Sequence, residues 1–412
     1  MKLQVSVCAG VMAAAMSFPA VAQEPEAAPV QAPAVQAPAV EAPAMEVSQQ
    51  APAPRQAPAG DVHIPFSLSL LPGISTNGFE SGRVVNNISL GVLATHAGRV
   101  DGLAMAMVGN WVDREMRGVE WAMGANYAGQ VQGTQMAVGV NVAGGSLKGW
   151  QTAVGVNVAA GELVGAQLAV GLNVAAGKSW GLQAATGLNI AEDLKGVQFS
   201  SGLNIASRLS GAQFSLLNVG GDVSGAQVGL LNVGGKVKGL QLGLINVASE
   251  ADSSIGLLSF VGNGQRHVQA WGSEMAMTNV ALKLGGRHMH TLFTVGLRPE
   301  REGRQRLWSA GLGMGGHIPV GHFFMDVDLL AHSLHTGGFI EPSGHLLGQL
   351  RWVAGWQPYR HFAIFGGLTA NTLVSFVDEE VQGVDRFKLG AVYDSERVRV
   401  QTWPGLIAGL QI

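Results

Sequence analysis

The chain has 412 residues, of which 47% are hydrophobic and 13% are charged, and its formal net charge at pH 7 is -3. No basic run occurs in it, so the composition excludes a nucleic-acid partner. No run of about 18 apolar residues follows the N-terminal segment, which argues against a helical membrane protein. The 59 glycines instead favour a β membrane protein or a tightly stacked solenoid.

Residues 1–22 have the three parts of a secretory signal peptide. Lys2 supplies the positive charge, residues 5–16 form the apolar core, and Ala20-Val21-Ala22 is a small-residue cleavage site. The sequence therefore predicts export, with a mature chain that begins at Gln23. The single cysteine, Cys8, precedes this position, so disulfides and thiol catalysis are excluded for the mature chain.

Residues 23–60 form a low-complexity segment rich in proline and alanine, in which QAPAV, QAPAV and EAPAM follow one another at a five-residue spacing. Such a composition does not bury a core, so we expect an extended, partly polyproline linker. It is either a plain spacer or a segment that reaches toward the cell wall or another partner.

Residues 61–264 form a short-repeat β region. From about Gly118 to Ala248 a unit with a period of 14 to 16 residues recurs, in which Gly-x-Gln is followed by Asn-Val or Asn-Ile, and degenerate strands precede it. In the copy GAQLAVGLNVAAG, residues 165–177, aliphatic side chains alternate with Gln, Ala, Gly and Asn. A period of two is typical of a strand. A strand of about ten residues, tilted by about 40°, spans about 25 Å, which matches the apolar band of an outer-membrane barrel.

This pattern favours an all-β fold, an antiparallel transmembrane β-barrel built from 14–16-residue strand and turn repeats. Residues 265–412 are expected to complete the barrel, since they continue the alternation with longer, more aromatic strands. The alternative is a β-solenoid in which each repeat forms one coil with glycines at its corners, followed by a smaller C-terminal barrel.

The most regular polar residues are the amides of the repeats. If the strands pair in register, these amides form two belts that either line a lumen or bond to one another as ladders. The residues concerned are Gln135, Gln151, Gln167, Gln183, Gln198, Asn141, Asn157, Asn173, Asn189 and Asn204.

Asp326 and Asp328 share one face of a predicted strand, and charges avoid lipid, so both are expected to point inward. We expect them to pair with Arg351 or another cation; the alternatives are an acid–base mechanism or a cation-selective constriction. His288 and His290 are spaced to share a strand face, but no metal-site spacing joins them to carboxylates. The sequence therefore predicts no catalytic site, no metal and no cofactor.

Several blocks resemble a family of largely uncharacterised surface-repeat proteins of Gram-negative bacteria. These blocks are FSLSLLPGISTNG at residues 66–78, VNNISLGVL at residues 85–93, the serial GLQLGLINVA units, and residues 261–299. The resemblance implies a location in or at the outer membrane, with lipid as a partner, and it implies no catalytic activity. We thus expect an outer-membrane protein that is a passive channel or has a structural role; the alternative is a surface-exposed solenoid that binds an external partner.

Overall fold

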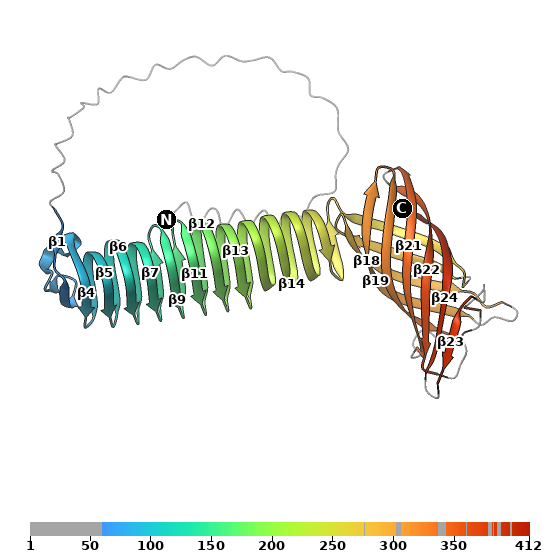
Figure 1. Ribbon diagram of the computed structural model, residues 1–412, viewed down its shortest axis with the longest axis horizontal. Coiled ribbons are helices and arrows are strands. Elements are labelled where there is room, and N and C mark those ends of the chain that lie inside the picture. Colours follow the sequence, from blue (N-terminus) through green and yellow to red (C-terminus); the bar gives the residue numbers. More distant parts are fainter. Residues whose placement is uncertain are drawn as a thin grey trace, which may run out of the picture.

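The computed structural model describes residues 60–412 except 276, 302–305, 337–342, 360, 378–380, 382, 385–388 and 396–397. The predicted signal peptide and all but the last residue of the predicted linker lie outside the described residues. The described chain is all-β, and it forms a long stack of coils followed by a closed barrel (Figure 1). No helix among these residues is both long and apolar enough to span a membrane.

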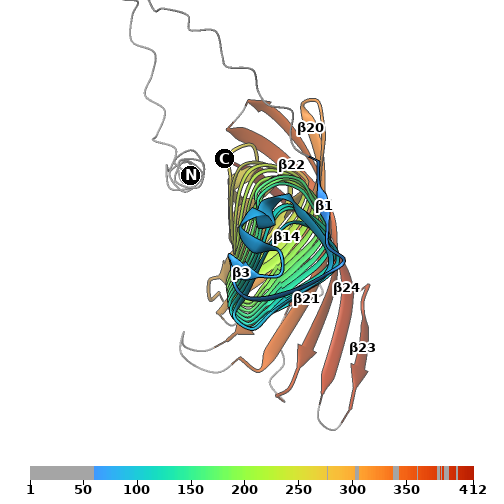
Figure 2. The same ribbon diagram turned by 90° about the vertical axis from the view of Figure 1, so that its left-hand side faces the viewer.

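The stack begins with a small cap. Its elements lie across the free end of the stack, where they cover the first coil (Figure 2). The cap consists of β1 (Val62–His63), β2 (Phe66–Leu71), β3 (Ile74–Ser75) and the 3-10 helix η1 (Gly78–Arg83).

In the stack, each repeat is one coil that pairs in parallel with the coils before and after it. Gln167 lies opposite Gln151 and Gln183, and Asn173 lies opposite Asn157 and Asn189. The strands are β4 (Val84–Gly91), β5 (Ala94–Ala106), β6 (Gly109–Ala122), β7 (Ala125–Ala137), β8 (Val140–Ala143), β9 (Leu147–Ala153), β10 (Val156–Ala159), β11 (Leu163–Ala169), β12 (Leu172–Ala185), β13 (Leu188–Ser200), β14 (Leu203–Ile255) and β15 (Leu258–Val261).

The antiparallel arrangement expected for the repeats is therefore wrong, and the solenoid alternative describes them. The physical reason is the register of the repeat. Parallel stacking sets every residue against its own equivalent, so that Gln meets Gln and Asn meets Asn. An antiparallel hairpin would reverse the order of positions and set the amides against apolar residues.

The repeat glycine allows consecutive coils to approach closely. Gly149, Gly165 and Gly181 have φ values of 136°, 138° and 140°, a region that residues with a Cβ rarely adopt. A Cβ added to Gly165 would collide with the carbonyl oxygen of Gly149 in the preceding coil. The recurrence of this glycine in each repeat is thus a requirement of stacking.

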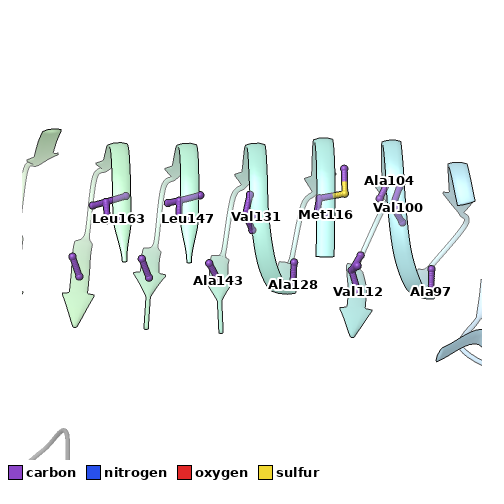
Figure 3. Close-up of a cluster of buried hydrophobic side chains, with 12 residues drawn as sticks. Ala97, Val100, Ala104, Val112, Met116, Ala128, Val131, Ala143, Leu147 and Leu163 are labelled. Atoms are coloured by element: carbon purple, nitrogen blue, oxygen red, sulfur yellow. The ribbon is translucent and has the colours of Figure 1, made fainter. Parts of the chain in front are cut away.

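Two apolar columns fill the first coils. Leu147 stacks between Val131 and Leu163, while alanines such as Ala128 and Ala143 stack on the other side of the interior (Figure 3). Alanine leaves room for the buried amides that share this narrow interior, so the two kinds of side chain pack together there.

The C-terminal region forms a closed antiparallel barrel of eight strands, because the last strand pairs with the first. The barrel strands are β16 (Gln265–Ser273), β17 (Thr278–Gly285), β18 (Met289–Arg298), β19 (Leu307–Val320), β20 (Phe323–His335), β21 (His345–Tyr359), β22 (Phe362–Ser375) and β24 (Arg399–Gln411), with the short β23 (Ala391–Asp394) paired beside β24. These strands close among themselves, so they do not complete a larger barrel with the repeats.

The stack and the barrel are joined by hydrogen bonds as well as by the chain. In β14, Ser253 pairs with Met289, and the neighbouring carbonyls of Ala251 and Asp252 accept hydrogen bonds from Arg287 and His288 at 3.0 and 2.8 Å. The stack consequently has a fixed direction. It extends sideways from the barrel instead of prolonging the barrel axis (Figures 1 and 2).

Candidate functional site

The ten amides singled out in the sequence lie inside the stack, in two ladders, and none lies in the barrel. All ten are fully buried. Along the glutamine ladder, each side-chain nitrogen donates to the side-chain oxygen of the preceding coil, as Gln167 does to Gln151 at 2.8 Å. The nitrogen also reaches a backbone carbonyl across the interior, that of Val174 at 3.0 Å.

The asparagine ladder runs beside it with the opposite direction of donation. Asn157 donates to Asn173 at 2.9 Å, which lies in the following coil. The same nitrogen donates to the backbone carbonyl of Leu168 at 2.7 Å. The two ladders therefore link consecutive coils by hydrogen bonds on both sides of the interior. Removing a buried amide with this many partners lowers stability, because the partners are left unpaired.

The glutamine ladder begins with a carboxyl group. Glu120 occupies the glutamine position of its coil and accepts a hydrogen bond from Gln135 at 2.8 Å, while its second oxygen has no partner among the described residues. Burial raises the pKa of Glu120 to about 8, and the hydrogen bond from Gln135 offsets only part of that rise. The carboxyl group is thus neutral at pH 7 and behaves as one more rung.

The outer surface of the stack is strongly divided. Each coil has one stretch that carries the ladder glutamine, which we call the glutamine strand, and one that carries the ladder asparagine, which we call the asparagine strand. At the turn from the glutamine strand to the asparagine strand, ten coils expose a large apolar side chain. We call this row the apolar edge; it consists of Val92, Met107, Met123, Val138, Val154, Val170, Leu216, Leu230, Leu244 and Leu257.

All charged residues between positions 140 and 250 lie at the other turn of the coil, after the buried alanine or glycine that follows Asn-Val or Asn-Ile. We call this row the charged corner; it consists of Lys148, Glu162, Lys178, Glu192, Asp193, Lys195, Arg208, Asp222, Lys236, Lys238 and Glu250. The glutamine strand runs from the charged corner to the apolar edge and the asparagine strand runs back, so the two rows lie at opposite ends of each coil.

The barrel interior holds a network of buried ion pairs around the two predicted aspartates. Asp326 accepts hydrogen bonds from Lys283 and His317, both at 2.6 Å, and Asp328 accepts them from Arg351 and His290, both at 2.7 Å. Both aspartates point inward. The sequence suggested Arg351 or another cation as the partner of the two; Arg351 pairs with Asp328, and the other cation, Lys283, pairs with Asp326.

Two carboxylates, one lysine and one guanidinium balance one another without any further ion. The guanidinium of Arg351 is held in addition by Gln269 at 2.9 Å and by the ring of Trp271, whose centre lies 4.7 Å away. The side chains of Lys283 and Arg351 are fully buried.

Three of these residues could also hold a metal ion. One ligand atom of each of His290, Asp326 and Asp328 lies within 4.8 Å of the others. Lys283 and Arg351 already neutralise both carboxylates, so an added divalent ion would bring an unbalanced charge. His288, which the sequence set beside His290, is exposed in the turn before β18 and does not join the group.

A second buried cluster lies nearer the long loops of the barrel. Glu274 accepts hydrogen bonds from the indole nitrogen of Trp403 at 2.9 Å and from Asn371 at 3.0 Å. Sequence reasoning missed this cluster, and it missed Glu120 and Lys283 as well. Glu120 was visible as Gly-x-Glu in place of Gly-x-Gln, whereas the others required knowledge of which strands are neighbours.

The outer wall of the barrel is apolar on every strand. Each of the eight strands exposes at least one large hydrophobic side chain, for example Val268, Leu282, Val295, Met314, Leu329, Trp352, Leu368 and Leu410. Aromatic side chains gather at the end where the turns are short, namely Phe323, Trp356, Tyr359 and Phe362. The wall is thus apolar and the centre charged, the reverse of a soluble barrel.

Comparison of the chain with protein-family models, with curated proteins and with solved structures gives no match, so its function rests on the geometry described above.

Proposed function

We propose that the protein is a non-catalytic outer-membrane protein, in which the eight-stranded barrel is the anchor and the stack is a binding platform. The observation that carries this proposal is the inverted polarity of the barrel. Its wall exposes aliphatic and aromatic side chains, while Asp326, Asp328, Lys283 and Arg351 are enclosed within it. This is the arrangement that a hydrocarbon solvent favours.

The dimensions of the strands support an anchor. β19 to β22 have 13 to 15 residues, enough to cross the apolar core of a bilayer at the usual tilt with residues to spare. The aromatic side chains at the short-turn end would lie at the level of the lipid headgroups. A passive channel is less well supported, because buried ion pairs fill the centre of the barrel.

The side of the membrane follows from the loops. The stack joins the barrel at the end with short turns. At the other end lie the strand ends that are far apart in the chain, namely Arg298 and Leu307, His335 and His345, and Ser375 and Arg399. In outer-membrane barrels the short turns face the periplasm. We therefore infer that the stack lies on the periplasmic side, where its long repetitive surface offers contact with the cell wall or a protein partner.

The anchor is tested by placing a charge on the barrel wall. Leu329 is exposed in the middle of β20, and an arginine on the lipid-facing surface of a barrel costs roughly 2–4 kcal/mol. Leu329→Arg should reduce the fraction of protein that stays with outer membranes after a carbonate wash. Ser210→Arg, at an exposed position of the stack beside the charged corner, is the matched control and should leave that fraction unchanged.

The folded barrel should also migrate differently on gels before and after boiling. If the protein extracts into water without detergent, or if both arginine variants partition alike, the barrel is not an anchor.

A further inference from the structure

The apolar edge of the stack is too long and too continuous to be left in water. Val154, Val170, Leu216 and Leu230 are 53% to 61% exposed, and the row spans twelve coils, of which only the two with Thr186 and Ser201 lack a large apolar side chain there. Exposed apolar surface of this extent indicates contact with another apolar phase. The segregation of every charge to the opposite corner points the same way.

The apolar edge also meets the apolar wall of the barrel. Its last member, Leu257, directly follows Gly256, whose carbonyl accepts a hydrogen bond of 2.7 Å from the hydroxyl of Thr291. Thr291 lies on the outward face of β18, because its neighbours His290 and Leu292 are fully buried inside the barrel. The same outward face continues with the exposed side chain of Val295. The two apolar surfaces therefore join at this point.

The direction of the stack also favours contact with the membrane. The stack leaves the barrel sideways and is held there by hydrogen bonds between β14 and the start of β18 (Figure 1). A barrel that crosses a bilayer would hold such a stack along the membrane and not away from it.

We propose that the stack lies along the bilayer with its apolar edge inserted among the acyl chains of one leaflet and its charged corner in water. The proposal rests on the anchoring role proposed above for the barrel. The stack is then an interfacial element, bound as amphipathic helices are by a buried apolar strip and a hydrated polar side.

A groove beside the apolar edge fits this occupant. It has a volume of about 860 Å³ and is lined mainly by apolar side chains, among them Val154, Leu168, Val170 and Phe199. It opens where the residues of the edge and its flank are small, as at Thr152, Ala184 and Thr186. A flexible acyl chain fills such a shallow, uncharged groove without needing a specific polar partner.

The test uses a fluorescent probe on single cysteines in the full-length chain carrying Cys8→Ser, reconstituted in phosphatidylcholine vesicles. Val170→Cys reports on the apolar edge, Lys178→Cys on the charged corner, and Met325→Cys on the barrel wall, where Met325 is 55% exposed. Lipids that carry a quencher in the acyl chain should quench the probes at positions 170 and 325 at least twofold. The probe at position 178 should stay unquenched by lipid and accessible to iodide.

The outcomes separate the two proposals. Quenching at position 325 without quenching at position 170 overturns the lipid contact of the stack and leaves the anchor intact. No quenching at position 325 overturns the anchor itself. If position 170 is shielded from both lipid and iodide and its free thiol forms a disulfide between chains, the edge is covered by a second copy of the protein and the lipid proposal fails. Leu230→Cys, four coils further along the edge, repeats the measurement should Val170→Cys fold poorly.

Discussion

Glu120 and Gln135 share a hydrogen bond of 2.8 Å, which places a buried carboxyl group at the head of a column that amides continue through the next eight coils. Ala104 occupies the equivalent place in the coil before, so the column begins at Glu120. A neutral carboxyl group has nearly the shape of an amide, and burial raises the pKa of Glu120 to about 8. The stack should therefore be sensitive to alkaline pH at this residue.

The first prediction concerns Glu120→Gln. The folded chain keeps the Glu120 proton up to about pH 8, whereas the unfolded chain releases it near its ordinary pKa of about 4.3. The free energy of unfolding should thus be highest below the unfolded-state pKa of about 4.3. It should fall by roughly 4 kcal/mol between pH 5 and pH 8 and level off above pH 8. Glu120→Gln should remove this fall and stabilise the stack at pH 8.

Urea unfolding of the detergent-solubilised protein, followed by circular dichroism at both pH values, checks this. Glu162→Gln, at an exposed turn, is the control and should leave the pH dependence in place. An unchanged pH dependence in Glu120→Gln would mean that the carboxyl group is already ionised at neutral pH.

The second prediction concerns the asparagine ladder. Asn173→Asp keeps the shape of the side chain but removes the nitrogen that donates to Asn189 at 2.9 Å and to the carbonyl of Ala184 at 2.8 Å. Leaving these buried acceptors unpaired should destabilise the stack by roughly 2–5 kcal/mol. Asn87→Asp is the matched control, because Asn87 is exposed. Equal urea midpoints for the two variants would show that the ladder adds nothing to stability.

The third prediction concerns the stacked glycines. Gly165→Ala adds a Cβ at a φ of 138° and against the carbonyl of Gly149, so the coils must separate locally. We expect a loss of roughly 2–4 kcal/mol and new protease cleavage within the stack. Gly272→Ala, where an added Cβ meets open space, should leave the cleavage pattern as it is. Intact coils in Gly165→Ala would show that the backbone has room to adjust there.

The fourth prediction concerns the ion pair between Asp328 and Arg351. Asp328→Asn or Arg351→Met alone leaves one buried charge unbalanced and should lower barrel stability by roughly 3–5 kcal/mol. The double variant should recover part of this loss. The urea midpoint is measured from the fraction of protein in the heat-modifiable gel band. Midpoints for the unchanged protein, the two single variants and the double variant together make up the double-mutant cycle. Additive effects would mean that the two charges are screened by water inside the barrel.

The fifth prediction concerns sidedness. Tyr393→Cys, in β23 at the long-loop end, should react with a membrane-impermeant maleimide in intact cells, since Tyr393 is 70% exposed. His322→Cys, in the exposed turn between β19 and β20, should react only after the outer membrane is permeabilised. The opposite labelling pattern would place the stack on the cell surface.

The sequence was a good guide to local structure and a poor one to pairing. The alternation around Gln167 and Asn173 correctly predicted strands, and the inward position of Asp326 and Asp328 followed from their shared parity. Side chains alternate between the two faces of a strand in the same way in a parallel coil and in an antiparallel hairpin. The alternation therefore did not decide between the solenoid and the large barrel. The repeated Gly-x-Gln held that information, since only parallel stacking sets Gly165 against Gly149.

The contacts inside the barrel could not be predicted from the sequence. Lys283 and Asp326 are 43 residues apart in the chain, and their ion pair depends on which strands curve toward each other. Similarly, Glu274 meets Trp403 across 129 residues. A single sequence offers no signal for such contacts beyond the inward parity of each residue.

The opposed directions of the two ladders bear on how such a protein grows. Each coil adds one glutamine dipole pointing toward the N-terminus and one asparagine dipole pointing toward the C-terminus, and the two largely cancel. Duplication or deletion of a whole coil therefore changes the length of the molecule without accumulating a field along it. A chain with one coil more or fewer would keep the same interior chemistry and differ only in reach.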